Sequence, residues 1–581
     1  MLTPLQLTLV ASLPPAYRAA LDRHCRRLSR LKGERPDDAL LIELTAAPLA
    51  EQPRRQALAE ALARSEPEST AALRAEIAEL GRCFAYAAAF EAMVEQLRTC
   101  VGDDDVLMLI DAGPESLSAK ALARAKAASR RQDAESLTGA ALVEHRRRCC
   151  RRTQARRLRK AVNVARLAVG VVLGEIGQVS KNRAQLYAPD LSVVASQQRD
   201  AATKAWAEGH VLTDGAELAV PMTEILKGAA KRRFNTLWSL TRACEQVAES
   251  QGLACLFLTL SLPPAYHRNP SQGRRGGWQE GLTPIVGIEE LQRRWRRIRA
   301  RLRKEGIAQL GLWTQEPHED GTPHRHLLIW VARDQAARLV EIYRSVFEDG
   351  HEAFEGGVAV NVKRWNAAEA GKPSSYIMKY LTKTFAGGEE HVDQTEGTER
   401  HLENADRVAA WRRGAPGKRS YDFVGLKPGA IGVWTKVASL RNGTRALMDE
   451  TFGAAYGEIL TGAFADALLR LGLLAADATA VPWRVEKEAA ISAYGEVYQR
   501  PVRLHSDTGG EIELRSDLEI VPKEEIELRA AAVAAGATLQ AAPSVAVVVN
   551  YPRAGAGAPL REASPPASPP VAANEGWSAV A

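Results

Sequence analysis

The chain has 581 residues, of which 46% are hydrophobic and 25% are charged, and its formal net charge is +7 at pH 7. These values are typical of a globular protein with several domains, and they exclude disordered, collagen-like and disulfide-framework chains. No apolar run reaches the roughly 18 residues of a membrane span, and the basic start of a signal peptide is missing. The seven cysteines lack C-x-x-C spacing, which predicts free thiols in the cytoplasm.

The positive charge is concentrated in two segments. Residues 120–166 hold 15 basic and 3 acidic side chains, and residues 268–304 hold 11 basic and 3 acidic side chains. The two segments carry a net charge of +20, so the rest of the chain carries −13. One such run is usually a solvated helix face, but two runs in one chain favour a protein that binds nucleic acid phosphates.

The residue composition and the order of the predicted helices and strands divide the sequence into four regions. Residues 1–245 are rich in Ala, Leu and Arg, which predicts a mostly helical, basic region that binds duplex DNA or a host factor through residues 146–160. Residues 246–440 follow the order strand, helix, hairpin, helix, strand, helix, which predicts an α+β domain with an antiparallel sheet. Residues 441–550 are mixed, with helices at 445–475 and a hairpin turning at Gly509 and Gly510. The Pro- and Ala-rich residues 551–581 predict a disordered tail.

Within residues 246–440, a buried strand is predicted at 255–261, because an apolar run ends at two prolines. A helix follows, in which five apolar residues repeat at helical spacing and would face a core, namely Ile288, Leu291, Trp295, Ile298 and Leu302. The outer face of this helix carries the predicted DNA-binding residues Arg293, Arg296, Arg297 and Arg299. Strands at 310–317 and 323–332, a helix at 335–347, a strand at 358–362 and a helix at 375–385 complete the pattern.

The two strands at 310–317 and 323–332 form a predicted hairpin that turns at Asp320 and Gly321. Residues two apart in a strand share a face, so His324 and His326 point the same way. The turn places Glu316 opposite His324, with His318 as a reserve ligand on the same face. Two imidazoles and a carboxylate suit Mg²⁺ or Mn²⁺ acting on a phosphate, with zinc as a competitor. Packing alone would explain a bare H-x-H, but the acid across the turn favours a metal site.

The helix predicted from residue 375 carries two phenols and two ammonium groups on one face. Tyr376, Lys379, Tyr380 and Lys383 are spaced by three and four residues, and a serine before them is the expected N-cap. A nearby lysine favours the phenolate, which is the form that attacks phosphorus. A half-buried helix with aromatic anchors is the simpler interpretation, and the metal hairpin about 50 residues upstream in the same domain favours the nucleophilic one.

These motifs resemble those of the phage replication gene A proteins in the HUH endonuclease superfamily. The resemblance rests on Glu316-Pro-His-x-Asp-Gly-Thr-Pro-His-x-His326 and on Tyr376-Ile-x-Lys-Tyr380. It is supported by the stretches 257–261, 266–267 and 420–426 with Trp434, and it covers roughly residues 180–440. The family usually has a bulky apolar residue between the two histidines, where this chain has Arg325, which we expect on the opposite face of the strand.

The resemblance implies a central HUH-type, ferredoxin-like antiparallel sheet with flanking helices. It implies His324, His326 and Glu316 as metal ligands and Tyr376 and Tyr380 as nucleophiles. Lys379 would stabilise the reacting tyrosine or phosphate, and we expect Lys383 to bind DNA. The implied activity is site-specific nicking and joining of single-stranded origin DNA through a 5′-phosphotyrosine, which starts rolling-circle replication of phage or prophage DNA in the bacterial cytoplasm. A separate host helicase is expected, because the sequence has no G-x-x-x-x-G-K-[ST] loop.

Three alternatives remain open from the sequence. A relaxase or transposase of the same superfamily would serve plasmid transfer or element mobility, although paired tyrosines argue against its single-tyrosine members. A non-catalytic nucleic-acid-binding regulator would use the histidines and tyrosines structurally. A metallohydrolase with two histidines and one glutamate would act through activated water, without a tyrosine.

Overall fold

The computed structural model describes residues 95–534, except 132–135, 181–182, 215–218, 272–276, 349–358, 365–371, 379–397, 416–419, 441–443, 477–479 and 515–517. Lys379, Tyr380, Lys383 and the predicted tail at 551–581 lie outside the described residues. Within the described part of the chain, no helix is both long and apolar enough to cross a membrane.

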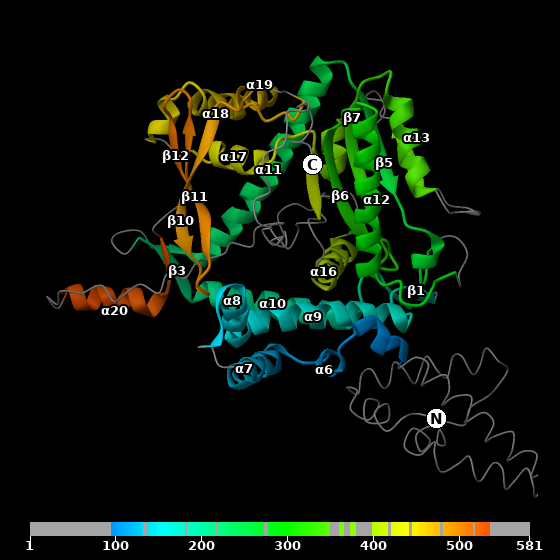
Figure 1. Ribbon diagram of the computed structural model, residues 1–581, viewed down its shortest axis with the longest axis vertical. Helices are drawn as coiled ribbons and strands as arrows, with labels where there is room; N and C mark the ends of the chain where they lie inside the picture. The colour runs from blue at the N-terminus through cyan, green and yellow to red at the C-terminus, as the bar shows by residue number, and fades with distance from the viewer. Residues whose placement is uncertain are drawn as a thin grey trace, which may run out of the picture.

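The centre of the protein is a five-stranded antiparallel sheet with the strand order β8–β5–β7–β6–β9 (Figure 1). Its strands are β5 (Ala254–Leu260), β6 (Leu310–Pro317), β7 (Pro323–Val331), β8 (Val360–Arg364) and β9 (Tyr421–Val424). The prediction of an α+β fold with an antiparallel sheet is confirmed. The strand predicted at 358–362 is observed two residues later, where Val360 pairs with Leu260 of β5.

Two helices cover one face of this sheet, α12 (Pro284–Lys304) and α13 (Ala336–Phe347). They pack on side chains from alternate positions of the strands, such as Leu258, Leu327 and Ile329. The predicted apolar stripe of α12 is confirmed, because all five of its members are buried: Ile288, Leu291, Trp295, Ile298 and Leu302. This packing fixes which face of each strand the remaining positions occupy, since side chains alternate along a strand.

The other face packs on α11 (Met222–Ser250), α17 (Ala430–Val437), α18 (Phe452–Thr461) and α19 (Phe464–Arg470). The sheet contributes Phe257, Leu312, Leu328 and Trp330 to this second core. Helix α11 continues to Ser250, so the boundary predicted between residues 245 and 246 falls inside a helix rather than in a loop. The region boundaries drawn from the sequence stay predictions.

The described N-terminal region is mostly helical and forms the lower layer of Figure 1. Its helices are α6 (Asp104–Leu107), α7 (Pro114–Arg131), α8 (Gly139–Cys149), α9 (Arg151–Val172) and α10 (Asp190–Glu208). It also contains two short strand pairs that have too few residues for a periodic pattern, β1 (Gly177–Ser180) with β2 (Arg183–Gln185) and β3 (His210–Thr213) with β4 (Ala219–Pro221). Helix α16 (Thr398–Gly414) packs between this layer and the central sheet.

The C-terminal region returns to the N-terminal layer. Strand β13 (Glu519–Pro522) pairs with β3 and leads into α20 (Lys523–Ala534). The predicted hairpin is confirmed as β11 (Val497–Ser506) with β12 (Glu511–Glu513), and β10 (Trp483–Ile491) adds a third strand. The loop between β10 and β11 contacts the basic helices, where Arg147 pairs with Glu496 at 2.5 Å and the Tyr494 hydroxyl lies 2.6 Å from that of Thr153.

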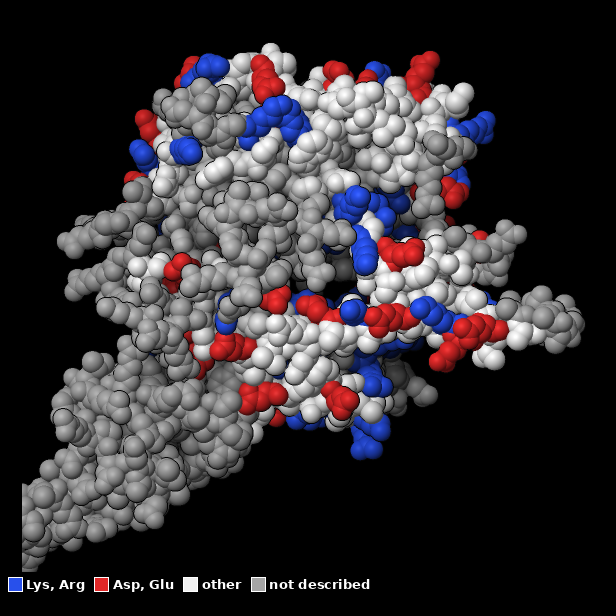
Figure 2. Space-filling view, turned by 180° about the vertical axis from the view of Figure 1, so that it is seen from behind, with Lys and Arg blue, Asp and Glu red and all other residues white. Residues whose placement is uncertain are grey.

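The positive charge of the N-terminal layer is partly neutralised within the protein. Glu144 forms ion pairs with Arg148 at 3.3 Å and with Arg157 at 3.1 Å. Figure 2 shows the molecule from behind. Acidic and basic side chains lie side by side across the lower part of this view, and a group of basic side chains lies near its centre. Within the sequence run at 146–160, Arg147, Arg148 and Arg157 therefore form ion pairs with acidic side chains of the protein itself.

Candidate metal centre

The pairing of β6 with β7 brings the three predicted metal ligands together. Glu316 pairs directly with His324, so the predicted register of the hairpin is confirmed. His326 and Glu316 lie on the same face as His324, towards α11. The three side chains are buried, and each offers a ligand atom that lies within 4.8 Å of the other two.

The turn of the hairpin explains why the register is fixed. Gly321 has a φ of 84°, a left-handed conformation that glycine adopts easily. The Asp320 carboxylate accepts a hydrogen bond from the N–H of Thr322 at 3.1 Å, and the N–H of His318 donates to the Thr322 carbonyl at 2.7 Å. The indole N–H of Trp411 on α16 donates to the Gly321 carbonyl at 2.8 Å, which ties the turn to the helical layer.

The two histidines are oriented for a shared ligand. Their Nε2 atoms lie 2.8 Å apart and their rings are nearly perpendicular, at 88°. The Nδ1 atom of His326 lies 3.0 Å from the hydroxyl of Thr259 on β5. The Nδ1 atom of His324 is buried without a hydrogen-bond partner in the described part of the chain. Burial, together with His326 and His267, lowers the pKa of His324 well below its ordinary value, and the neutral imidazole is the form that binds metals.

These residues fit a divalent metal ion. A carboxylate and two neutral imidazoles converge from one sheet face, and the second nitrogen of one imidazole is already held by a neighbouring hydroxyl. The donor set is that of a site with open coordination positions, which leaves room for a phosphate oxygen. Whether a metal binds, and which one, stays a prediction.

His318, the predicted reserve ligand, lies beside the triad and outside it. Its ring stacks on that of His324 with centroids 4.0 Å apart and meets the ring of His267 at 5.1 Å. His267 in turn lies 3.0 Å from the Asp320 carboxylate. Burial and the two neighbouring histidines lower the pKa of His318. The ring of His318 therefore packs against His324. Its nitrogen atoms do not belong to the group of ligand atoms that Glu316, His324 and His326 bring together.

Tyr376 lies next to this centre. Its ring meets that of Phe257 edge to face at 4.9 Å, and Phe257 stacks on His326 with centroids 5.6 Å apart. The ammonium group of Lys363 on β8 lies 5.3 Å from the centre of the Tyr376 ring. One aromatic side chain thus connects the predicted nucleophile to a predicted metal ligand. Tyr380, Lys379 and Lys383 lie outside the described residues.

The start of the tyrosine helix differs from the prediction of a serine N-cap. The helix begins at Pro373, and Ser374 is buried in its first turn. The hydroxyl of Ser374 donates to Glu245 Oε2 at 2.7 Å, and its N–H donates to Glu245 Oε1 at 3.4 Å. Arg242 forms an ion pair with the same carboxylate. A carboxylate of α11 therefore satisfies the free N–H group, which a local sequence pattern cannot reveal.

Three further side chains near the centre were missed as site residues by the sequence reasoning. Thr259 and Lys363 come from neighbouring strands, and Arg412 comes from α16. Burial lowers the pKa of Arg412 to about 10, an effect opposed chiefly by the negative charge of Glu316. Thr259 lies in a motif that the resemblance identifies, whereas nothing near Lys363 or Arg412 in the sequence indicates a site.

The predicted DNA-binding arginines of α12 are not brought to the metal centre. Helix α12 covers the face of the sheet opposite to the one that carries the histidines. Arg293 and Arg296 are exposed, and Arg293 binds both carboxylate oxygens of Glu290 at 2.7 Å. A DNA strand that reached both places would have to pass around the edge of the sheet. Their role in DNA binding stays a prediction.

The fold and the site define an α+β protein with a buried group of two histidines and one carboxylate beside a tyrosine. Residues 70–387 match the model of the bacteriophage replication gene A protein (GPA) family. This match covers more than half of the chain, so the chain belongs to that family, and the resemblance stated from the sequence is confirmed.

Named relatives support this membership. The chain is 28% identical to the replication gene A protein of Escherichia phage 186, over 44% of this chain and 37% of the relative. It is 26% identical to the probable replication protein P12 of Pseudoalteromonas phage PM2, over 62% of this chain and 56% of the relative. It is also 26% identical to a probable replication endonuclease from a prophage-like region of Salmonella paratyphi A, over 34% of this chain and 26% of the relative. The chain thus spans less than two thirds of each relative, and no solved structure matches it significantly.

Proposed function

We propose that this protein is a metal-dependent endonuclease that nicks and rejoins single-stranded DNA at a replication origin, and so initiates rolling-circle replication of phage or prophage DNA. The observation that carries the proposal is the contact chain from His326 through Phe257 to Tyr376, which sets a candidate nucleophile beside a candidate metal centre. The names of the relatives, which include replication gene A protein and probable replication endonuclease, support a role in DNA replication.

The topology supports an HUH-type, ferredoxin-like domain. Strands β5, β6, β7 and β8 alternate with α12 and α13 in the order strand, helix, strand, strand, helix, strand. The first and third of these strands are neighbours at the centre, flanked by the fourth and the second. The candidate ligands lie on the hairpin of β6 and β7, on the sheet face that is not covered by α12 and α13.

The chemistry assigned to the site is transesterification. Mg²⁺ or Mn²⁺ held by Glu316, His324 and His326 would polarise a non-bridging phosphate oxygen. The Tyr376 oxygen attacks phosphorus, a new oxygen–phosphorus bond forms, and the bond to the 3′ oxygen breaks. The tyrosine hydroxyl loses its proton and the leaving 3′ oxygen takes one up, so the products are a 3′ hydroxyl that primes synthesis and a 5′ phosphate that stays on the tyrosine. Tyr380 is assigned as the nucleophile of the second cut, and Lys379 as the residue that stabilises the reacting tyrosine or phosphate.

Other parts of the proposal concern partners. Lys383 and the exposed arginines of α12 are assigned to binding of the DNA strand, and a separate host helicase is assigned to unwinding. The site of action is the cytoplasm of a bacterial host. Each of these rests on the family resemblance and on the charge of the sequence.

The test is the formation of a covalent protein–DNA adduct. The full chain is incubated with Mn²⁺ and a labelled library of random single-stranded oligonucleotides, and SDS-resistant adducts are separated by electrophoresis. We expect an adduct with the native chain and none with Tyr376→Phe/Tyr380→Phe. His324→Phe should also abolish the adduct, whereas the matched control His318→Phe, which keeps a ring beside His324, should retain it.

Two results would contradict the proposal. An adduct that persists in the double tyrosine variant would show that another residue is the nucleophile. Cleavage without an adduct would show that activated water attacks the phosphate, as in metallohydrolases.

A further inference from the structure

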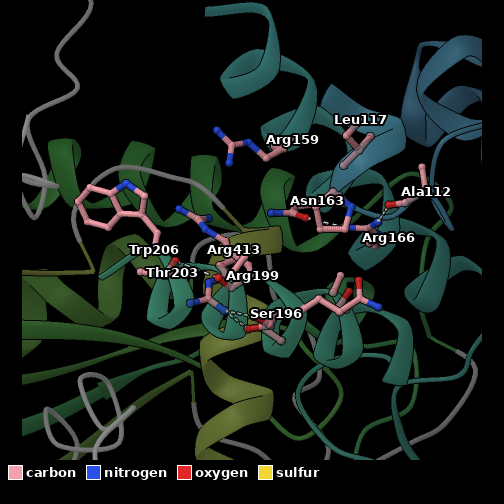
Figure 3. A pocket seen from close by; sticks show the side chains of 16 residues that line it. Ala112, Leu117, Arg159, Asn163, Arg166, Ser196, Arg199, Thr203, Trp206 and Arg413 are labelled. Atoms are coloured by element: carbon pink, nitrogen blue, oxygen red, sulfur yellow. Dashed lines mark hydrogen bonds between the residues drawn. The ribbon is translucent and has the colours of Figure 1, made fainter. Parts of the chain in front are cut away.

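A second candidate site lies in the helical layer. A pocket of about 320 Å³ opens between α7, α9, α10 and α16. Its lining includes Arg159 from α9, Arg199 from α10 and Arg413 from α16, three side chains that are far apart in the sequence. Figure 3 shows these three side chains extending towards the end of the pocket that holds Trp206. The opposite end is closed by Arg166, which donates to the carbonyls of Ile110 at 2.6 Å and Ala112 at 2.9 Å.

The cationic end of the pocket has more positive than negative charge. Asp200 binds the guanidinium of Arg413 at 2.6 and 2.9 Å, and Arg413 also donates to the hydroxyl of Ser196. Arg199 has no ion pair with the described carboxylates, and its pKa is affected by the positive charges of Arg413 and Arg159 and, in the opposite direction, by the negative charge of Asp200. Burial and these two positive charges lower the pKa of Arg199. One carboxylate therefore faces three guanidinium groups, and an anion would relieve the repulsion among them.

The same end offers an aromatic surface. Trp206 is 41% exposed, which is high for a large aromatic side chain, and it lines the pocket. Its ring stacks on His210 with centroids 4.7 Å apart, which holds the indole in place. The hydroxyl of Ser192, about 21 Å from Trp206 along α10, lines the other end of the pocket, and it is buried without a hydrogen-bond partner in the described part of the chain. Cationic groups beside an exposed indole are the combination that binds a nucleotide, because the phosphate is attracted and the base stacks.

We propose that this pocket binds a nucleotide, with its phosphate on Arg159 and Arg199 and its base on Trp206. The nucleotide is either one unit of a single DNA strand or a free nucleoside monophosphate, which share this chemistry. Arg413 lines the pocket while its neighbour on α16, Arg412, lies near Glu316 of the metal centre. Helix α16 thus links the pocket to the candidate metal centre. Binding of a nucleotide in the pocket does not require that the protein cleave DNA.

The test measures binding of the full chain to fluorescein-labelled 15-mer oligothymidylate by anisotropy, in EDTA so that no metal-dependent cleavage occurs. Arg199→Gln and Trp206→Ala should each weaken binding about 10-fold. The matched control is Lys204→Gln, which removes one positive charge from an exposed position of the same helix outside the pocket, and it should change binding by about twofold or less. Arg199→Gln should leave the melting temperature unchanged or higher, because it removes repulsion.

Competition with thymidine monophosphate and with inorganic phosphate identifies the source of the nucleotide. Displacement of the oligonucleotide by thymidine monophosphate, weakened by the same two substitutions, would assign the pocket to a free nucleotide. Binding of the oligonucleotide alone would assign it to a DNA strand. The proposal is overturned if Arg199→Gln and Trp206→Ala bind every probe as Lys204→Gln does. Because the assay contains no metal, a failure of the cleavage proposal leaves this result interpretable.

Discussion

Thr259 and His326 face each other across β5 and β7, and the hydroxyl oxygen of Thr259 lies 3.0 Å from Nδ1 of His326. With its Nδ1 engaged in this way, His326 directs Nε2 towards His324. Neighbours that hold the outer nitrogen of a metal-binding histidine fix the orientation and protonation of the ring. If the candidate centre binds a metal, Thr259 is expected to position one of its ligands.

Replacing Thr259 with valine removes the hydroxyl and keeps the shape of the side chain. We expect Thr259→Val to weaken Mn²⁺ binding about 10-fold, as the loss of such a neighbour typically does. Thr259→Ser keeps the hydroxyl and should stay within about threefold of the native affinity. Titration calorimetry with Mn²⁺ measures both, and equal affinities for the valine and native chains would show that the hydroxyl does not orient His326.

Arg325 lies on the opposite face of β7, as the alternation of the strand predicts. It is 2% exposed, and its guanidinium carbon lies 4.3 Å from the ring centre of Trp313. It donates to Gln315 at 3.3 Å and to Gln292 at 3.1 Å, while its NH1 atom has no hydrogen-bond partner among the described residues. Burial lowers the pKa of Arg325 to about 9, so the fold keeps a poorly solvated cation in its core.

We expect Arg325→Met to raise the free energy of unfolding by about 1 kcal/mol, because an apolar side chain of similar length needs no solvation. Mn²⁺ affinity should not change, since the substitution is on the face away from the histidines. Urea denaturation and calorimetry test the two parts. A loss of stability would instead show that the contact with Trp313 outweighs the desolvation of the cation.

Cys150 lies at the junction of α8 and α9, as the N-cap residue of α9. Burial by itself raises the pKa of this thiol, but hydrogen bonds from the Tyr494 hydroxyl and from Thr153 outweigh it and lower the pKa to about 7. A helix N-terminus also favours a thiolate. We expect Cys150 to react with iodoacetamide with a midpoint near pH 7, so that labelling increases as the pH rises through that value.

Tyr494→Phe removes one hydrogen bond to the thiolate and should shift this midpoint to higher pH. Peptide mass spectrometry after brief labelling at several pH values measures the midpoint, with Cys150→Ser as the control for assignment. An unchanged midpoint in Tyr494→Phe would show that the hairpin between β10 and β11 does not activate the thiol.

Features that depend on a few neighbouring residues were predictable. The hairpin register follows from a two-residue period and a turn at Asp320 and Gly321, so Glu316 could be set opposite His324 in advance. The buried face of α12 follows from helical spacing, and the side of the strand that Arg325 occupies follows from alternation. These rules need no knowledge of the rest of the chain.

Features that depend on distant packing were not predictable. Glu245 on α11 takes the place expected of a serine N-cap, because the helix start is buried against α11. Arg412 lies near Glu316, because α16 packs between the sheet and the helical layer. The position of α12 behind the sheet separates its arginines from the histidines, although the sequence sets both in one domain.

The sequence by itself determined the hairpin that sets Glu316 opposite His324 and the family, because short-range periodicity and motif spacing encode them directly. Tertiary structure alone decided that Phe257 connects His326 to Tyr376, and that arginines from α9, α10 and α16 meet in one pocket. The physical reason is that such contacts join segments tens to hundreds of residues apart. Their positions are set by how the apolar faces of sheet and helices pack, which no local pattern specifies.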